Sequence, residues 1–326
     1  MLARDLLEAL AGGDAVSGAS LARQAGVTRA AVWKQIESLR LKGVPIEAKV
    51  GGGYRLPWPT QLLEDKRIRE ALPPAARASL GMLEVHWDID STSSELARRN
   101  PVLDDLSFVL AETQSAGRGR RGRPWLSPPG MNLYLSVLKR FESGFAALSG
   151  LSLAVGVMVV RALDELGIRT AGLKWPNDVL AGNAKLCGIL VELSGEYSGP
   201  CAAIIGVGVN IRLPDSVHER AGQPVTDLAD MAGGQPPDRN AVAAAVIASL
   251  CEGLQDFERQ GFKAFVADYA DRDLLFQQPL RILDPRGEYE AVGEGVDERG
   301  GLRVRRADGS LVTVDSAEVS VRRSAP

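Results

Sequence analysis

The chain has 326 residues, of which 45% are hydrophobic and 24% are charged, with 38 lysines and arginines against 41 aspartates and glutamates. A chain of this length and composition is an ordinary globular protein that buries substantial cores, and it predicts two or three domains. Its three cysteines lie far apart without a C-x-x-C pair, which speaks against a disulfide framework and against a thiolate zinc site. They are Cys187, Cys201 and Cys251.

Other classes are excluded on similar grounds. The two histidines, His86 and His218, leave little material for a histidine-based metal site or catalytic triad. The longest uncharged apolar run, residues 145–160, counts 16 residues, which is short for a membrane span and predicts a buried helix. The start is acidic within five residues and no apolar segment follows, so no signal peptide is expected. We expect a cytoplasmic protein without membrane contact, zinc, haem or a tightly bound organic cofactor.

The N-terminal segment shows helix-turn-helix spacing. Residues 4–10 and 20–25 predict two short helices, the second capped by Ser20, and after a turn Thr28 caps a longer helix that runs to residue 42. In a helix-turn-helix the second helix of the pair enters the major groove by its N-terminal end. The side chains it would offer to phosphates or base edges are Thr28, Arg29, Trp33 and Lys34.

A two-stranded wing is expected next, formed by residues 44–50 and 54–56 around a glycine turn. Residues 1–60 hold eight lysines and arginines against five acidic residues, a net of +3, so the remainder of the chain carries −6. The basic part favours DNA as a partner. Small winged helices also serve only protein interaction or dimerisation, and the modest charge leaves that alternative open.

The first domain boundary falls near residue 60, because Pro57 and Pro59 make a stiff connector. Residues 62–72 predict one helix, which the following Pro73 and its neighbouring proline would end. A strand at residues 83–89 then leads through a run of small hydroxyl residues into a helix. Hydroxyls at a helix N-terminus usually only cap it, and they gain a function only if a polar ligand lies there.

The densest motif is the loop at residues 117–125, Gly-Arg-Gly-Arg-Arg-Gly-Arg-Pro-Trp. It holds four guanidinium groups within six residues, separated by glycines. Glycines let the backbone come close to a ligand, and guanidinium groups meet carboxylate or phosphate oxygens with paired hydrogen bonds. The loop is therefore interpreted as an anion-binding site.

Three other interpretations of this loop are weaker. The glycine spacing formally fits a dinucleotide fingerprint, but that motif requires a following helix, and the prolines at 124, 128 and 129 forbid one. A disordered RNA-binding tail is disfavoured because the loop lies between expected strands at residues 108–110 and 132–138. A solvated basic turn would not need Trp125 and several stiffening prolines.

A second dense motif, Lys-Trp-Pro-Asn-Asp at residues 174–178, reads as a strand end that turns abruptly and projects a cation, an amide and a carboxylate together. Such a trio could hold a nucleotide and its magnesium, although a plain turn explains the residues as well. A hairpin at residues 182–183 then places Lys185 at the start of an apolar strand. There it is either a guard of a sheet edge or a buried cation aimed at an anion.

The rest of the chain indicates an α+β protein with three domains. A strand at residues 202–209 and an amphipathic helix at 238–259 complete a central α/β domain, expected to hold a mixed sheet with flanking helices. Five short apolar runs after residue 276 predict a small SH3-like β-barrel. The runs cover residues 280–283, 289–296, 302–304, 311–314 and 319–321. The predicted domains are 1–60, 61–275 and 276–326.

Taken together, these motifs resemble the biotin protein ligases. The resemblance covers nearly the whole chain, and the arginine loop combined with the Lys-Trp-Pro-Asn-Asp motif is its most specific part. The N-terminal winged helix and the C-terminal barrel are similar to the bifunctional bacterial type, which is both a biotin ligase and a repressor of biotin synthesis. The motifs occur in the family's order: Ser91 and Thr92, Gln114, residues 117–123, 174–178, 185–192 and 206–210.

The resemblance implies a site for each reactant. Arg120, Lys185 and Asp178 would be catalytic, and Asp178 would meet magnesium through the ATP phosphates. Biotin would contact Ser91, Thr92, Ser93, Gln114, Gly117, Arg118, Arg120, Lys185 and Gly188. ATP would contact Arg118, Arg120, Arg123, Trp125, Lys174, Asn177, Asp178 and Asn210. The arginine loop would be loose without ligand and would order when biotin binds.

The resemblance also implies the partners. A biotin carboxyl carrier protein would accept the biotin on a lysine, operator DNA would meet the winged helix, and the adenylate-bound protein would be a homodimer. Two alternatives remain at this point: a lipoate ligase-like acyltransferase, and a biotin-sensing transcription factor without ligase activity. The full arginine loop argues against the first, and the intact Arg120, Lys185 and Asp178 argue against the second.

Overall fold

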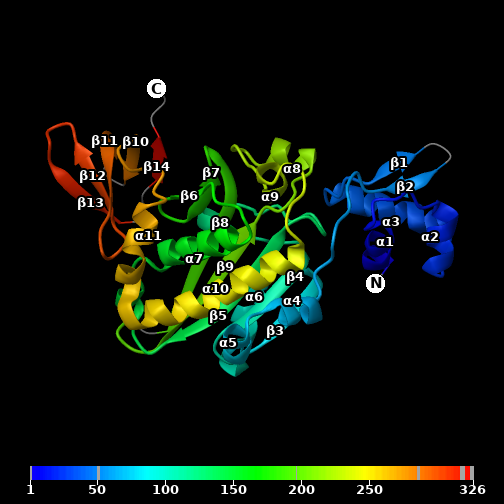
Figure 1. Cartoon of the computed structure of the whole chain (residues 1–326), viewed down its shortest axis with the longest axis horizontal. Coiled ribbons are helices and arrows are strands. Elements are labelled where there is room, and N and C mark those ends of the chain that lie inside the picture. The colour runs from blue at the N-terminus through cyan, green and yellow to red at the C-terminus, as the bar shows by residue number, and fades with distance from the viewer. Residues whose placement is uncertain (1, 50–51, 196, 285–286, 316–319, 324–326) are drawn as a thin grey trace.

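The computed structural model describes residues 2–49, 52–195, 197–284, 287–315 and 320–323. Three sheets divide the molecule along the chain, with two, seven and five strands. In Figure 1 the seven-stranded sheet and its helices lie in the middle, the N-terminal helices lie to the right, and the five-stranded C-terminal sheet lies to the left. The protein is therefore of the mixed α+β class, as the sequence predicts.

The N-terminal part contains the helix-turn-helix expected from its spacing. Its elements are α1 (Leu2–Leu10), α2 (Gly18–Gln24), α3 (Arg29–Leu41), β1 (Glu47–Lys49) and β2 (Gly53–Arg55). Thr28 caps α3, since its side chain accepts a hydrogen bond from the backbone of Ala31 at 3.2 Å. The prediction that Ser20 caps α2 is wrong: Ser17 is the cap, and its hydroxyl accepts from the Ser20 backbone. The cap lies three residues earlier because the helix starts at Gly18.

The wing is shorter than the sequence suggests. Strands β1 and β2 have three residues each, and they pair in antiparallel register. Val44 and Ile46, expected in the first strand, are instead buried in the core of the N-terminal part. Residue 50 lies outside the described residues. Val44 and Ile46 are thus buried in the core and do not extend β1 towards its N-terminal side.

The segment after the connector forms two helices where one was predicted. Helix α4 (Asp65–Ala71) ends before the two prolines, as expected, but α5 (Pro74–Ser79) begins at the second of them. A proline fits the first helical position because its missing N–H has no partner there in any helix. The two prolines therefore separate two helices and do not end helical structure.

The central sheet has the strand order β3-β4-β5-β9-β8-β7-β6, in which only β3 and β4 run parallel. Helices α7 and α10 pack on one face, over a core that contains Phe108 and Leu110. Helix α6 covers the other face, where Leu96 meets Val109. The strands are β3 (Leu83–Ile89), β4 (Ser107–Gln114), β5 (Leu133–Phe141), β6 (Ala171–Lys174), β7 (Asp178–Ala181), β8 (Ala184–Gly195) and β9 (Cys201–Val209).

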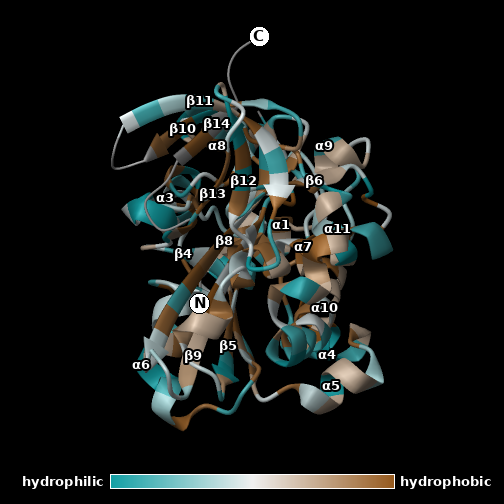
Figure 2. Ribbon diagram, turned by 90° about the vertical axis from the view of Figure 1, so that its left-hand side faces the viewer, coloured by the Kyte–Doolittle hydropathy of each residue, from teal (hydrophilic) through white to brown (hydrophobic). Residues whose placement is uncertain are grey.

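The long apolar run predicted as one buried helix is divided. Residues 145–148 form a short 3₁₀ turn, Gly150 adopts φ +78, and α7 (Leu151–Glu165) then runs buried through the core. Brown apolar colour marks α7 and the central strands in Figure 2, whereas α3 is largely teal. Within the described part of the chain, no helix is long and apolar enough to cross a membrane. The other helices are α6 (Thr92–Arg99), α8 (Asp215–Arg220), α9 (Leu228–Met231), α10 (Arg239–Gln260) and α11 (Val266–Ala270).

The C-terminal strands form an antiparallel sheet in the order β13-β12-β11-β10-β14. They are β10 (Pro279–Asp284), β11 (Gly287–Val296), β12 (Leu302–Arg306), β13 (Leu311–Val314) and β14 (Ser320–Arg323). Five strands were expected and five are found, although residue 319 of the expected last strand lies outside the described residues. Their closure into an SH3-like barrel stays a prediction.

Both terminal parts contact the central one. Met131, which follows the arginine loop, belongs to the core cluster of the N-terminal part, and Lys42 at the end of α3 forms an ion pair with Asp88 of β3 at 2.6 Å. At the other end, the carbonyl oxygen of Gly300 accepts a hydrogen bond from the indole of Trp175.

Candidate active site and nucleic-acid interface

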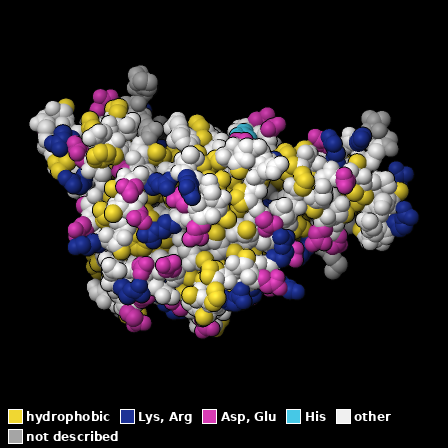
Figure 3. All heavy atoms as spheres, in the orientation of Figure 1, with side chains coloured by type: hydrophobic (Ala, Val, Ile, Leu, Met, Phe, Trp, Pro, Cys, Tyr) yellow, Lys and Arg dark blue, Asp and Glu magenta, His cyan; other side chains and the backbone are white. Residues whose placement is uncertain are grey.

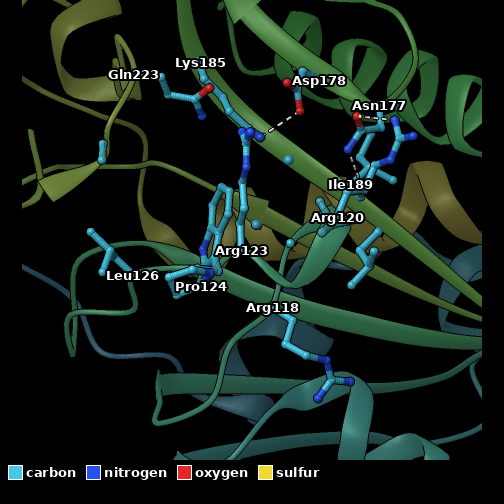
Figure 4. A pocket seen from close by; sticks show the side chains of 18 of the residues that line it. Arg118, Arg120, Arg123, Pro124, Leu126, Asn177, Asp178, Lys185, Ile189 and Gln223 are labelled. Atoms are coloured by element: carbon cyan, nitrogen blue, oxygen red, sulfur yellow. Dashed lines mark hydrogen bonds and ion pairs between the residues drawn. The ribbon is translucent and has the colours of Figure 1, made fainter. Parts of the chain in front are cut away.

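One cavity of about 1100 Å³ gathers most of the residues singled out by the sequence (Figure 4). Its walls are the N-terminus of α6, the arginine loop, residues 174–178, the first half of β8, and the glycines of β9. A segment that the sequence did not indicate, residues 220–224, also lines it. Chain segments distant in sequence thus meet at one hollow on the central sheet.

The hydroxyls at the start of α6 do more than cap the helix. Ser91 is the cap residue, while the Thr92 backbone donates to Gln114 Oε1 at 2.9 Å. The hydroxyl oxygens of Thr92 and Ser93 lie 2.7 and 3.0 Å from the hydroxyl oxygen of Ser136. Buried donors and acceptors that bond one another form a pre-organised network, which suits a small polar ligand at the helix end.

Ser136 was missed by the sequence analysis. It is fully buried on β5, within the strand expected at residues 132–138. Its signal was a lone serine among apolar residues of a central strand, and this pattern alone does not reveal which face of the sheet the serine occupies. Ser127 was missed as well: its hydroxyl oxygen lies 3.3 Å from Gln114 Nε2 and supports the amide that binds Thr92.

The arginine loop is a closed hairpin with a tight tip. The backbone N–H of Trp125 donates to the carbonyl oxygen of Gly117 at 2.9 Å, and that of Gly119 donates to the carbonyl oxygen of Arg123 at 2.7 Å. At the tip, Arg121 and Gly122 both have positive φ, 58° and 69°. A positive φ is costly for arginine and free for glycine. The loop therefore holds its guanidinium groups on a short, bent frame.

The arginines of the loop point in different directions. Arg120 is half-buried and donates to Asn177 Oδ1 at 3.2 Å, and burial lowers the pKa of its guanidinium. Arg118 points away from that pair in Figure 4 and binds Ser94 and Glu192, at 2.9 and 3.3 Å. Arg120 thus faces the cavity interior, while Arg118 bridges α6 and β8 at its margin.

Glycines in β8 and β9 form the floor of the cavity. A Cβ atom on Gly208 would lie 2.6 Å from the Trp125 indole, and one on Gly188 would lie 2.8 Å from it. A Cβ on Gly206 would lie 3.1 Å from the Ser93 hydroxyl. Side chains at these positions would fill the space, so the glycines permit close approach of a ring to the sheet.

Lys185 is a largely buried cation in the cavity. Its Nζ lies 2.7 Å from Asp178 Oδ1, its side chain is 18% exposed, and it sits 5.5 Å from the Trp125 ring centre. Its backbone pairs with Pro224 and Thr226, so β8 is covered on this side. Of the two interpretations left open by the sequence, the buried cation fits this geometry and the edge guard does not.

The Lys-Trp-Pro-Asn-Asp segment turns between β6 and β7 through a cis peptide bond at Trp175-Pro176. Asn177 is held by two bonds to Ile189 of β8, one from its side chain at 2.8 Å and one at its backbone oxygen at 3.1 Å. Lys174, Asn177 and Asp178 all line the cavity. The expected cation, amide and carboxylate therefore do face one hollow.

Two candidate residues hold supporting positions outside the described lining. Asn210 is buried, and its amide donates to the backbone oxygens of Lys185 and Thr226 at 3.2 and 3.1 Å. Gly117 lies at the base of the arginine loop, where a Cβ would come 3.0 Å from Gln114 Nε2. Asn210 thus fixes the backbone beside Lys185, and the missing side chain of Gly117 leaves space for the Gln114 amide. Ser91, Thr92, Ser93, Gln114, Arg118, Arg120, Arg123, Trp125, Lys174, Asn177, Asp178, Lys185 and Gly188 line it.

No group of three or more histidine, cysteine, aspartate or glutamate side chains in the described ranges could hold a metal ion. The three cysteines are free and buried, and burial raises the pKa of the Cys251 thiol to about 11. A buried thiol of raised pKa is a poor nucleophile. The chemistry of the cavity accordingly rests on its cations, amides and Asp178.

A second candidate surface lies on α3. Thr28, Arg29, Lys34 and Trp33, which is 58% exposed, all face solvent, while the apolar stripe of the helix packs inward. Figure 3 shows lysine and arginine side chains at the right-hand end of the molecule, over the N-terminal part, with acidic side chains among them. The N-terminal end of α3, the second helix of the helix-turn-helix pair, is therefore exposed, as insertion into a DNA groove requires.

Comparison with known proteins defines the class first. Residues 88–210 match the biotin/lipoate A/B protein ligase family, residues 3–55 match a helix-turn-helix domain family, and residues 277–322 match the biotin protein ligase C-terminal domain. Biotin protein ligase from Aquifex aeolicus, solved in complex with biotin and ATP, is 31% identical with a TM-score of 0.66, and the match covers 74% of this chain and 99% of that one.

Relatives over the full length refine the assignment. The chain is 36% identical to the bifunctional ligase/repressor BirA of Escherichia coli, covering 97% of this chain and 96% of the relative. It is 30% identical to the protein of the same name from Bacillus subtilis, with 98% of each covered. The chain belongs to the biotin protein ligases, in the bifunctional form that joins the ligase to a helix-turn-helix repressor domain.

Proposed function

We propose that the cavity activates biotin with ATP in one step and transfers it to a protein lysine in a second. An oxygen of the biotin carboxylate attacks the α-phosphorus of ATP, and the bond to the pyrophosphate leaving group breaks. The carrier lysine amine then attacks the carbonyl carbon of biotinyl-5′-AMP, AMP leaves, and the nitrogen loses a proton. The observation that carries this proposal is Lys185, a largely buried cation 2.7 Å from Asp178 in a cavity also lined by Arg120.

Biotin would occupy the half of the cavity next to α6. The hydroxyl and amide network of Ser91, Thr92, Ser93 and Gln114 supplies donors and acceptors for a ureido group. The glycines of β8 and β9 let the Trp125 indole lie against the sheet, where it would form one wall for a flat ring system under the arginine loop. Arg118 and Gly188 border this half, and Gly117 supports it from the base of the loop.

ATP would occupy the half next to residues 174–178. Two anionic reactants must be brought together, and the cations of the cavity offset their repulsion and the charge that builds at phosphorus. Arg120 and Lys185, which both line the cavity, would lie nearest the reacting atoms, and Arg123, Trp125, Lys174 and Asn177 would surround the nucleotide. Asn210 would act indirectly, by holding the Lys185 backbone.

Magnesium would arrive on the ATP phosphates. The donor set suits this, because Asp178 is the one carboxylate among the described residues that line the cavity, and Mg²⁺ commonly takes one or two carboxylates plus phosphate oxygens. The ion would supply further charge neutralisation when bound. Asp178 would then contact both Lys185 and the ion. Its proposed catalytic role depends on this contact with the ion.

Repression would use the exposed end of α3. Thr28, Arg29, Trp33 and Lys34 would meet operator DNA, and two copies of the chain would be needed to span two half-sites. A homodimer formed by the adenylate-bound protein would therefore link biotin supply to DNA binding. We further propose three domains, 1–60, 61–275 and 276–326, the last an SH3-like barrel, and a biotin carboxyl carrier protein as acceptor.

The test is biotin-dependent exchange of labelled pyrophosphate into ATP by the purified protein, followed by transfer of labelled biotin to a carrier domain. Exchange with transfer is the expected result. Biotin binding without exchange would leave a biotin-sensing transcription factor. Thermal stabilisation by lipoate in place of biotin would indicate a lipoate ligase-like enzyme and overturn the substrate assignment.

A further inference from the structure

The side chain of Trp175 connects the active-site segment to the C-terminal sheet. Its indole is 1% exposed, and its Nε1 donates a hydrogen bond of 3.0 Å to the backbone oxygen of Gly300. Gly300 lies in the turn between β11 and β12. Trp175 also lines the cavity, directly after Lys174 and three residues before Asp178.

The turn that supplies this oxygen is internally fixed. One carboxylate oxygen of Asp297 accepts from the backbone N–H groups of Arg299 and Gly301, each at 2.9 Å, and the Gly300 N–H donates to the Asp297 backbone oxygen at 3.0 Å. The Asp297 N–H also donates to the Gly301 oxygen at 2.9 Å, and four bonds within five residues leave the turn little freedom. The carbonyl of Gly300 is therefore presented at a defined point.

The same turn is pressed against the start of α7. A Cβ on Gly300 would lie 2.7 Å from the Cα of Gly150, and the Ser149 hydroxyl donates to the Arg299 oxygen at 2.7 Å. Gly300 has φ +81, so glycine is needed there for its backbone conformation as well as for the space. The turn thus rests on the core helix of the central part.

On the cavity side, the residues just after Trp175 hold two cations. Asn177 accepts from Arg120, and Asp178 pairs with Lys185. A shift of the indole would move both acceptors, because only one proline separates Trp175 from Asn177. Displacement of a reacting group by about 1 Å costs on the order of a hundredfold in rate.

We propose that the Gly300 carbonyl positions residues 174–178 through the indole N–H of Trp175, so that the C-terminal sheet sets the geometry of the nucleotide half of the site. Trp175 and Gly300 are positioning residues in this view. The proposal rests on the proposed function, which assigns that half of the cavity to ATP. The ureido end of biotin, which the proposed function places at α6 and β5 on the far side, should sense the contact much less than ATP does.

The first test is Trp175→Phe, which keeps an aromatic ring and removes the donor. The expected result is a rise of about tenfold in the KM for ATP or a similar fall in kcat for pyrophosphate exchange, with a much smaller change in the Kd for biotin. An unchanged exchange rate would overturn the proposal while leaving the ligase assignment intact. Absence of exchange in the unaltered protein would instead overturn the proposed function.

A second variant guards against simple loss of folding. Gly300→Ala should give the same selective loss, since its Cβ would force the turn away from Gly150. Gly309→Ala is the matched control, because Gly309 has φ +83 in another turn of the C-terminal sheet and a Cβ there meets nothing within 4 Å. Equal losses in the two glycine variants, or strictly additive losses in the Trp175→Phe, Gly300→Ala double variant, would contradict a positioning contact.

Discussion

The two walls of the cavity differ in how they are held. The arginine loop is closed by a few backbone hydrogen bonds, and its arginine side chains point in different directions, with Arg118 turned away from Arg120 in Figure 4. The facing wall, residues 174–178, is held by bonds to β8 and to the C-terminal turn, and Trp175 is fully buried. One wall can adjust around a ligand and the other can align it, which suits a site that must first admit and then orient two anions.

The walls also rest on different ends of the chain. The segment that follows the arginine loop packs against the N-terminal part, where Met131 joins its core and a Cβ on Gly130 would come 2.9 Å from Leu7. Residues 174–178 rest on the C-terminal turn at Gly300. The cavity therefore lies where the helix-turn-helix part and the C-terminal sheet each support one side.

Replacing Lys185 by alanine should remove the cation that both walls share. We expect a loss of about 10²–10³-fold in pyrophosphate exchange, because a preorganised charge at the developing anion is gone. The measurement is the initial exchange rate at saturating biotin and ATP. Lys263→Ala, at an exposed lysine paired only at 3.6 Å with Glu298, is the control and should retain full activity. Wild-type turnover of Lys185→Ala would remove this lysine from the mechanism.

Hydrogen exchange should separate the two walls directly. Biotin alone is expected to slow amide exchange in residues 117–125 by roughly tenfold, since that loop has few bonds to lose and gains a ligand. Residues 174–178 should respond to ATP and not to biotin. The readout is peptide-level mass spectrometry with and without each ligand. Equal protection of both segments by biotin would show that the walls act as one unit.

Ser136→Ala should weaken biotin binding and spare ATP. The change removes the hydroxyl that bridges Thr92 and Ser93, and loss of a buried hydrogen bond of about 1 kcal/mol corresponds to a roughly fivefold higher Kd for biotin. Calorimetric titration with biotin measures it. Ser249→Ala, which loses a hydroxyl bond to the Met158 backbone on the far helices, is the comparison and should bind biotin normally. A changed KM for ATP in Ser136→Ala would contradict the assignment of biotin and ATP to separate halves of the cavity.

The smallest effect concerns acid stability at the start of α6. Hydrogen bonding to Arg98, aided by the Ser91 backbone, lowers the pKa of Asp90 from 3.8 to about 2. A lowered folded-state pKa adds stability above the unfolded value, and this is lost as pH falls from about 4 towards 2. Urea midpoints of Asp90→Asn and the unaltered protein should differ slightly at pH 6 and converge near pH 2. If the two urea midpoints differed by the same amount from pH 6 to pH 2, the difference would come from altered packing and not from the charge of Asp90.

Several features of the fold and the site could be predicted from short stretches of sequence. The helix-turn-helix spacing, the hairpin turn before Lys185 and the polar motifs at residues 117–125 and 174–178 depend on neighbouring residues, and the structure contains each of them. Errors occurred where local rules compete. The two prolines predict the end of a helix, but the second of them is also the first residue of α5. The apolar run predicts one continuous helix and does not reveal that Gly150 turns the backbone before α7 begins.

The sequence by itself determined the elements and the charged groups, because capping, periodicity and turn chemistry act over a few residues. Only the tertiary structure decided that Lys185 points into the cavity, that Ser136 completes the network at α6, and that Asn210 serves the Lys185 backbone. The partners are 7 positions apart for Lys185 and Asp178, 44 for Ser136 and Thr92, and 25 for Asn210 and Lys185. Which residues meet depends on the register of the strands and on the face of the sheet that each side chain occupies. Such pairings are set by burial of the whole sheet, which no short stretch of sequence contains.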